Sequence, residues 1–321
     1  MHEVLENLGK IGIVPVIKID DVEKALPLAR ALIAGGIPCA EITFRTAQGE
    51  EAIRRIAKEV PEILLGAGTV LTVDQADRAI AAGAKFVVSP GLNPKVVAHC
   101  IQRGIPITPG CANPSDIEQA LEFGLEVVKF FPAEQAGGLE YIKAVSAPYP
   151  NLKFMPTGGI NADNISRYSA FEKIHACGGS WMAGAELINS NDFEKITVLS
   201  REAILSLLGL HVAHIGINAR ETALDAALLL NSLFGFSIKE GNTSVFAGSI
   251  ELVKKNAPGT HGHIAIGATS IARAAAYLER RGIFLDYDNV KKDAQGKVTS
   301  IYLKEEILGF AVHLVNNSPP V

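Results

Sequence analysis

The stretch VVKFFP, residues 127–132, is an apolar run that contains one lysine and ends in a proline. Near-continuous apolar runs of this length are typical of strands that are buried on both faces of a parallel sheet. Similar runs recur through the first part of the chain, starting roughly every 19 to 26 residues. In chain order they are IVPVIK (13–18), IPCAEITF (37–44), ILLGAGTV (63–70), FVVSPG (86–91), IPITPG (105–110), VVKFFP (127–132), KFMPTGG (153–159) and IHACGGSW (174–181).

Amphipathic helical patterns separate these runs, for example DVEKALPLARALIAGG (21–36) and PSDIEQALEFG (114–124). Eight strands that alternate with helices predict an α/β fold in which the strands close into a (β/α)8 TIM barrel. An open, doubly wound sheet is the alternative. Its nucleotide-binding turn is not matched, because GAGTVL has Leu71 where the third glycine of GxGxxG would stand.

The composition limits the class of protein. The chain has 321 residues, a net charge of -4 and 20% charged residues, which predicts one or two globular domains and argues against nucleic acid or an anionic membrane as partner. No apolar run reaches the ~18 residues of a membrane span, and the N-terminus MHEVLENLGK is too polar for a signal peptide. Four widely spaced cysteines favour the reducing cytoplasm.

The pattern changes after the helix predicted at 193–209, and we expect a domain boundary between 207 and 210. Residues 1–207 would form the barrel, and residues 208–321 a smaller α+β domain of two βαβββ modules. Five of the eight histidines lie after residue 210. The expected elements of the two modules are HVAHIGINA, a helix, FGFSIKEG, NTSVFAG and SIELVKK, and then HGHIAIGATSI, the helix IARAAAYLERRG, FLDYD, VTSIYLK and GFAVHLV.

Two strands carry charged side chains that would face the barrel interior. Side chains alternate along a strand, so Lys129 would lie on the face opposite Val128 and Phe130. In EITFR (41–45) the same alternation predicts that Glu41 and Arg45 share the inward face. Charged groups are costly to bury unless they are paired or have a function.

An amine beside a carboxylate suggests a particular chemistry. A lysine whose pKa is lowered by burial or by a neighbouring cation can attack a keto group and form a Schiff base. A nearby carboxylate can then transfer protons to and from the reacting atoms. The alternatives are a lysine that extends past apolar neighbours to solvent, and a structural ion pair between Glu41 and Arg45.

The motifs of the first 207 residues, in their order, resemble those of the bacterial 2-keto-3-deoxy-6-phosphogluconate / 2-keto-4-hydroxyglutarate aldolases. The motifs are EITFRT (41–46), GAGTV (66–70), SPG (89–91), TPG (108–110), VKFFPAE (128–134), PTGGI (156–160) and GGSW (178–181). The resemblance implies a Schiff-base (class I) aldolase that needs no cofactor and assembles as a homotrimer.

The resemblance also implies roles for individual residues. Lys129 would form the imine with pyruvate and Glu41 would be the general acid/base. The residues that would bind the pyruvate carboxylate are Arg45, Thr69 and Pro90. The residues that would hold the distal phosphate are Gly158, Gly159, Gly179 and Ser180. Loops after the last two barrel strands also often bind phosphate through backbone N–H groups, although paired glycines can simply form tight turns.

The implied reaction is the cleavage of 2-keto-3-deoxy-6-phosphogluconate to pyruvate and glyceraldehyde 3-phosphate, with 4-hydroxy-2-oxoglutarate as a second substrate. The 6-phosphogalactonate epimer is the alternative substrate, and Thr157 favours the gluconate form by resemblance.

Residues 211–315 resemble, more loosely, the vicinal oxygen chelate (glyoxalase-like) superfamily, on HIGI (214–217), LFGF (233–236), IELV (250–253), HIAI (263–266) and FAVHLV (310–315). The resemblance implies a divalent metal bound by His214, Glu251, His263 and His313. His313 departs from the pattern, since a glutamate is usual there. Strand-end histidines are also often only structural.

Two other functions remain open. The chain could be a metal-dependent glyoxalase-like enzyme that uses the barrel as a scaffold, and chelation would then abolish its activity. It could also be a binding protein with a degenerate barrel and a regulatory second domain, which any measurable turnover would exclude.

Overall fold

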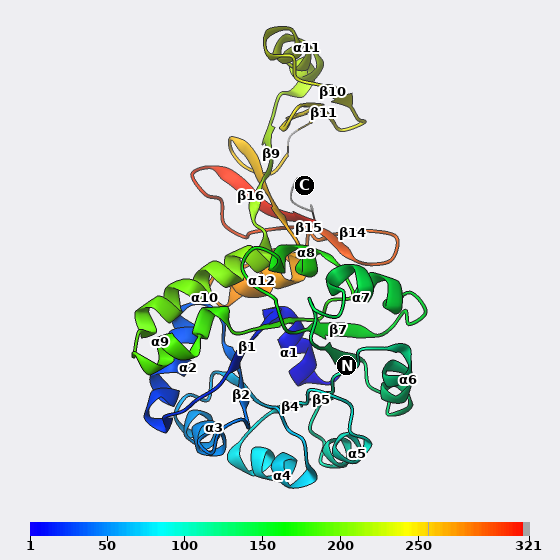
Figure 1. The fold of residues 1–321 in the computed structure, drawn as a ribbon. Helices are drawn as coiled ribbons and strands as arrows, with labels where there is room; N and C mark the ends of the chain where they lie inside the picture. The colour runs from blue at the N-terminus through cyan, green and yellow to red at the C-terminus, as the bar shows by residue number, and fades with distance from the viewer. Residues whose placement is uncertain (256, 317–321) are drawn as a thin grey trace. The chain divides into compact units, whose positions relative to one another are not determined.

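The computed structural model describes residues 1–255 and 257–316. The chain divides into two compact units, Met1–Leu207 and Leu208–Val321. In Figure 1 the first unit runs from blue to green and the second from yellow-green to red.

The first unit alternates strands and helices along its whole length (Figure 1). Its strands are β1 (Ile13–Ile17), β2 (Cys39–Thr43), β3 (Leu64–Gly68), β4 (Phe86–Val88), β5 (Ile107–Thr108), β6 (Val127–Phe130), β7 (Lys153–Pro156) and β8 (Cys177–Gly179). Its helices are α1 (Glu3–Ile11), α2 (Ala25–Ala34), α3 (Gly49–Glu59), α4 (Val73–Ala82), α5 (Pro94–Gln102), α6 (Pro114–Glu122), α7 (Gly138–Ser146), α8 (Ile165–Ala170), α9 (Ala185–Asn189) and α10 (Phe193–Leu208).

The strands form a closed parallel barrel. Strands β1 to β5 pair in sequence order, β8 pairs with β1, and β6 pairs with β7. Bridges between Gly110 and Lys129 and between Thr157 and Gly178 close the two remaining gaps. The predicted (β/α)8 barrel is therefore confirmed, with each of the eight apolar runs supplying one strand.

Local sequence explains where several of the outer helices begin. Thr72, Asn93 and Asn113 cap α4, α5 and α6, and each side chain accepts a hydrogen bond from a backbone N–H of the first turn. Proline follows the cap in α5 and α6, where the missing N–H costs nothing. These caps stand just after β3, β4 and β5, so each helix begins within a few residues of the strand before it.

The second unit contains one eight-stranded sheet in the order β10-β11-β12-β9-β13-β16-β15-β14. Its strands are β9 (His211–Ile217), β10 (Ile238–Glu240), β11 (Ser244–Ala247), β12 (Ile250–Val253), β13 (Gly262–Ala268), β14 (Lys291–Lys292), β15 (Val298–Tyr302) and β16 (Phe310–Asn316). Its helices are α11 (Ala223–Phe234) and α12 (Ile271–Glu279). Each half of the unit follows the order strand, helix, three strands.

Two expected strands differ from the structure. FLDYD (284–288) contributes only an isolated bridge at Leu285, and the short strand of that region lies later, at Lys291–Lys292. The predicted strand through EITFR ends at Thr43, so Arg45 lies in the following turn and leaves the alternation of the strand. No helix in the described part of the chain is long and apolar enough to cross a membrane.

The close approach of the chain segments that follow β4 and β5 depends on a glycine. A Cβ atom on Gly110 would lie 1.9 Å from the carbonyl oxygen of Pro90, which is backbone and cannot turn aside. Gly91, in the neighbouring SPG motif, would meet nothing within 4 Å.

We therefore expect Gly110→Ala to destabilise the protein by about 1–3 kcal/mol or more, because the two strand ends must separate. The matched control Gly91→Ala should stay within about 0.5 kcal/mol of the parent protein. Thermal unfolding followed by circular dichroism measures both variants. Equal melting temperatures for the two variants would contradict the prediction.

Candidate functional site

Lys129 and Glu41 meet inside the barrel. β2 and β6 are not neighbours, since three strands separate them in either direction around the barrel. The Lys129 Nζ atom nevertheless lies 3.8 Å from Glu41 Oε1, and the two residues are only 5% and 1% exposed. Side chains from opposite walls can approach in this way only across the interior. The lysine is therefore buried and does not extend to solvent.

The Glu41 carboxyl group is poorly solvated. Both of its oxygens are buried and lack a hydrogen-bond partner among the described residues. Burial raises the pKa of Glu41, and the charges of Lys129 and Arg45 offset this effect only in part. A carboxyl group with a raised pKa can hold and release a proton closer to neutral pH than an exposed one.

Gly68, to which the sequence analysis gave no role, makes room for the Glu41 side chain. A Cβ atom on Gly68, at the end of β3, would lie 2.0 Å from Glu41 Oε1. Gly68 is paired with Thr43 of the neighbouring strand. A glycine inside a strand often marks a close approach by another group, so the GAGT motif did contain a signal for this contact.

The predicted carboxylate-binding residues follow the strands β2, β3 and β4. Arg45 is exposed, and its Nε donates a hydrogen bond to Thr43 Oγ1 at 3.2 Å. Thr69 has a φ of 57°, which is unusual for a β-branched residue and costs roughly 1–3 kcal/mol. Pro90 follows β4, and its carbonyl oxygen would lie 1.9 Å from a Cβ atom on Gly110. The strained backbone at Thr69 coincides with the barrel end where active sites lie.

The predicted phosphate-binding residues follow β7 and β8. Gly158 and Gly159 have φ values of 99° and 79°, which favour glycine, and their N–H groups donate no hydrogen bond within the described structure. Thr157 is buried and its hydroxyl group has no partner there. Gly179 ends β8, and Ser180 is exposed beside it. Free N–H donors on a glycine-rich turn are well suited to an anion.

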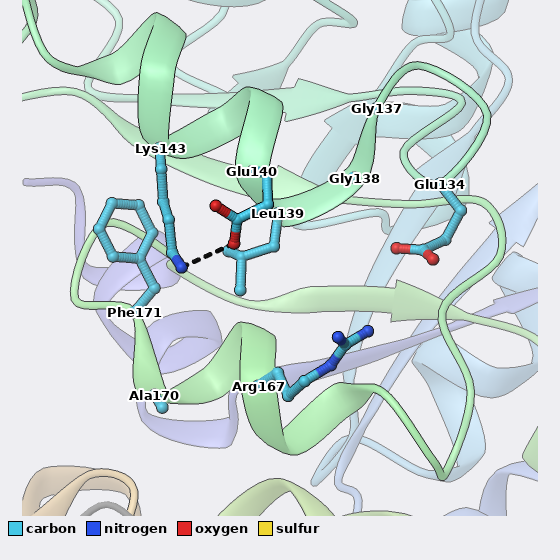
Figure 2. A pocket seen from close by; sticks show the side chains of 9 residues that line it. All are labelled: Glu134, Gly137, Gly138, Leu139, Glu140, Lys143, Arg167, Ala170 and Phe171. Atoms are coloured by element: carbon cyan, nitrogen blue, oxygen red, sulfur yellow. Dashed lines mark hydrogen bonds and ion pairs between the residues drawn. The ribbon is translucent and has the colours of Figure 1, made fainter. Parts of the chain in front are cut away.

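A separate pocket of about 550 Å³ lies between the loop after β6, α7 and α8 (Figure 2). Glu134, from the VKFFPAE motif, lines it and accepts a hydrogen bond from the Tyr168 hydroxyl group. Figure 2 shows the Arg167 side chain extending toward Glu134 across the pocket. Among the described residues that line this pocket, none belongs to the predicted site.

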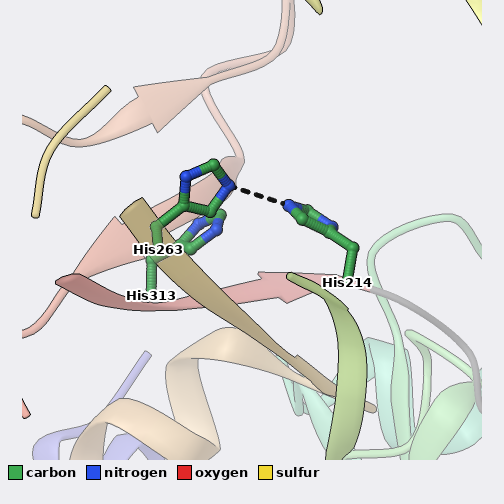
Figure 3. A group of neighbouring side chains, drawn as sticks. All are labelled: His214, His263 and His313. Atoms are coloured by element: carbon green, nitrogen blue, oxygen red, sulfur yellow. Dashed lines mark hydrogen bonds between the residues drawn. The ribbon is translucent and has the colours of Figure 1, made fainter. Parts of the chain in front are cut away.

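In the second unit, His214, His263 and His313 converge from the three adjacent strands β9, β13 and β16 (Figure 3). Each ring offers one nitrogen, and these atoms all lie within 4.8 Å of one another. Glu251, from β12, completes the group, because its Oε2 lies 3.0 Å from His263 Nε2 and 3.2 Å from His214 Nε2. The structure thus brings all four predicted metal ligands together.

We call these four residues, His214, His263, His313 and Glu251, the histidine cluster. The distances between their donor atoms fit a bound cation better than a set of hydrogen bonds. His214 Nε2 and His263 Nε2 are 3.2 Å apart, so the two nitrogens and Glu251 Oε2 form a triangle with sides of 3.0–3.2 Å. Each ring nitrogen carries at most one proton, and an ionised Glu251 carries none. With both rings neutral, at most two of the three contacts in the triangle can be hydrogen bonds. A tetrahedral zinc ion with bonds of about 2.0–2.1 Å needs a donor separation of about 3.3 Å.

The electrostatics of the cluster also favour a metal. Hydrogen bonds from His214 and His263 hold the pKa of Glu251 well below its usual value, so the carboxylate is ionised. Burial, together with the neighbouring charges of His263 and His214, lowers the pKa of His313 to about 3. A neutral imidazole and an ionised carboxylate are the protonation states that bind divalent cations.

Known proteins resemble the first unit closely. The chain is 53% identical to the 2-dehydro-3-deoxy-phosphogluconate aldolase of Treponema pallidum over 204 residues, which are 64% of this chain and 97% of that protein. It is 42% identical to the KHG/KDPG aldolase of Escherichia coli over 192 residues, 60% of this chain and 90% of that protein.

A solved structure matches the same region. It is the KDPG aldolase of Legionella pneumophila, with pyruvate captured as a covalent carbinolamine, and it superposes with a TM-score of 0.61 at 38% identity. The match covers 62% of this chain and 97% of that one. The sequence model of the KDPG and KHG aldolase family matches residues 4–199. By its sequence over most of the barrel, and by the fold of that barrel, this chain belongs to the KDPG and KHG aldolase family.

Proposed function

We propose that the barrel is a Schiff-base aldolase that cleaves 2-keto-3-deoxy-6-phosphogluconate to pyruvate and glyceraldehyde 3-phosphate. The observation that carries the proposal is the buried pair of Lys129 and Glu41, with 3.8 Å between the amine and the carboxylate. Family membership and the names of the relatives support the same substrate class. Residues 1–207 would then be the aldolase domain.

The reaction needs no cofactor. The neutral amine of Lys129 attacks the C2 keto group to form a carbinolamine. Protonated Glu41 donates its proton to the C2 hydroxyl group, which leaves as water, and a protonated imine and the Glu41 carboxylate remain. Glu41 takes the proton of the C4 hydroxyl group, the C3–C4 bond breaks, and the imine accepts the electron pair as an enamine. Glyceraldehyde 3-phosphate leaves, and Glu41 gives the proton that it took from the C4 hydroxyl group to C3. Water then hydrolyses the imine, which releases pyruvate and the neutral Lys129 amine, and Glu41 takes up the proton that is set free.

The two ends of the substrate would bind at different strand ends. Arg45, with Thr69 and Pro90, would hold the carboxylate next to C2. The free N–H groups of Gly158 and Gly159, with Gly179 and Ser180, would hold the phosphate. The unpartnered hydroxyl group of Thr157 would face the sugar hydroxyls, and a preference for gluconate over the galactonate epimer would arise there.

A relative named KHG/KDPG aldolase supports 4-hydroxy-2-oxoglutarate as a second substrate, which yields pyruvate and glyoxylate. This substrate has no phosphate, so it would use only the contacts at the pyruvate end. We also propose a cytoplasmic homotrimer, as the family resemblance implies. Sedimentation equilibrium should give the mass of three chains.

Borohydride reduction in the presence of pyruvate should trap a pyruvyl adduct on Lys129. The imine is reduced to a stable secondary amine, and peptide mass mapping locates it. Lys129→Met should abolish both the adduct and turnover. Lys153→Met is the matched control, because Lys153 lies on the adjacent strand β7 at the opposite end from the predicted site. An unmodified Lys129 in folded, active protein would contradict the mechanism.

Glu41→Gln should lower turnover by about 10²–10⁴-fold, since the amide cannot transfer a proton. The same variant should be more stable than the parent protein at neutral pH. The folded-state pKa of Glu41 is raised, so the folded state binds more protons than the unfolded state above about pH 4.3. The parent protein therefore loses stability as the pH rises through the folded pKa, and the glutamine variant does not.

Denaturant unfolding between pH 4 and pH 8 measures this effect. The stability difference between the two proteins should be smallest at pH 4 and grow with pH until it levels off. A glutamine variant that is less stable than the parent at pH 8 would show that the net electrostatic effect has the opposite sign.

We also propose that residues 208–321 form a glyoxalase-like module that binds one divalent metal through the four residues of the histidine cluster. Two observations favour this second site: the three histidine nitrogens lie within 4.8 Å of one another, and Glu251 Oε2 lies 3.0 Å from His263 Nε2 and 3.2 Å from His214 Nε2. Two of the buried ring nitrogens, His263 Nδ1 and His313 Nε2, have no partner among the described residues. His313 Nε2 would be one of the metal ligands, and the bound metal would act as a Lewis acid.

Zinc titration by isothermal calorimetry should find one site per chain. His263→Ala should lose that site, whereas the control His261→Ala should keep it, because His261 is exposed and packs on Phe310 outside the cluster. Aldolase turnover should be unchanged by EDTA and by either variant. Loss of pyruvate release on chelation would instead favour the metal-dependent enzyme with the barrel as scaffold.

A further inference from the structure

We infer that Ser300 and Tyr302 of β15 are positioning residues that fix the ring of His313 and direct its Nε2 toward a bound metal. This inference rests on the metal site proposed above and adds two residues that neither the sequence motifs nor the family resemblance identified. It concerns the second unit alone.

Strand pairing places both residues against His313. β15 is antiparallel to β16, and Tyr302 pairs directly with His313, while Ser300 pairs with Val315 two residues along. Ser300 and Tyr302 are two positions apart, so their side chains lie on the same face of the sheet as their partner. On the other side of β16, the parallel pairing with β13 brings His313 beside Ala265, two residues from His263.

Two contacts restrict the ring. Ser300 Oγ lies 2.8 Å from His313 Nδ1, and Ser300 is only 7% exposed. The Tyr302 ring stacks on the His313 ring with 4.6 Å between centroids and 13° between planes. The hydrogen bond fixes rotation about the last side-chain bond, and the stacking fixes the plane. His313 Nε2, on the far side of the ring, is buried without a partner in the described structure.

The hydroxyl group of Ser300 can accept a hydrogen bond from Nδ1–H, which is the tautomer of His313 that binds a metal through Nε2. A metal needs the lone pair of Nε2, so the single proton of the neutral ring must be on Nδ1. Nδ1–H then donates to Ser300 Oγ, which keeps that proton satisfied inside the protein. Without the hydroxyl group, metal binding would leave a buried N–H without an acceptor. Partners of this kind commonly change metal affinity by about 10–100-fold.

The test is zinc affinity of the full chain, measured by competition with a chromophoric chelator. Ser300→Ala should weaken zinc binding by about 10–100-fold. Ser300→Thr, which keeps the hydroxyl group, should bind within a few-fold of the parent. Thr299→Ala is the matched control, because Thr299 is the exposed neighbour on the same strand and points to the opposite face. Tyr302→Leu should weaken binding less than Ser300→Ala, since it leaves the tautomer unchanged.

A second readout separates positioning from simple stabilisation. ¹⁵N NMR of the zinc-loaded parent protein should show His313 with its proton on Nδ1 and the metal on Nε2. Melting temperatures of the zinc-free proteins show whether Ser300→Ala loses zinc affinity only because it unfolds. If Ser300→Ala is unfolded, the zinc affinity of Ser300→Thr still tests the role of the hydroxyl group.

The outcomes distinguish the two proposals. If the parent binds zinc, His313→Ala loses binding and Ser300→Ala binds like the parent, the positioning role is overturned and the metal site stands. A zinc-loaded His313 with its proton on Nε2 would overturn it as well. If the parent protein binds no zinc at all, the metal site is overturned and the role of Ser300 with it.

Discussion

The contact between Lys129 and Glu41 is the constraint that the interior of the barrel has to accommodate. An amine and a carboxylate from strands on opposite walls occupy an interior that would otherwise be filled with apolar side chains. Among the described residues the carboxylate finds no hydrogen-bond donor, and burial raises its pKa. A buried pair of this kind contributes little to stability compared with well-packed apolar residues. The proposed aldolase reaction gives a reason for its presence.

Glycines make this arrangement possible. Gly68 leaves the space that the Glu41 carboxylate occupies, and Gly110 lets the end of β5 approach the carbonyl of Pro90. Gly178 similarly leaves room for Thr157, because a Cβ atom there would lie 2.3 Å from the threonine hydroxyl oxygen. In the motifs GAGT, TPG and GGSW, a glycine is therefore needed because another group approaches closely, and turn geometry is only part of the reason.

The second unit brings polar groups together by a different principle. Four neighbouring strands of one sheet, β12, β9, β13 and β16, each supply one donor to the histidine cluster. Gly216 again provides space, since a Cβ atom there would lie 1.9 Å from the His263 ring. An open sheet fixes donor spacing through its register, whereas the barrel brings side chains together by enclosing them. The two units therefore bring their candidate residues together in different ways.

The sequence by itself determined the barrel, because apolar runs and amphipathic helices in an eightfold alternation are local patterns that each segment carries alone. It also determined which strands hold the candidate residues, since alternation along VVKFFP places Lys129 on a single face. The sequence pattern wrongly placed Arg45 on the strand of Glu41, which ends at Thr43. The pattern also missed β14, because two lysines carry no strand pattern. Only the tertiary structure decided that Glu41 meets Lys129, that Gly68 makes room for it, and that Ser300 contacts His313. These contacts join segments far apart in the chain, and closure of the barrel and the register of the sheet set their distances.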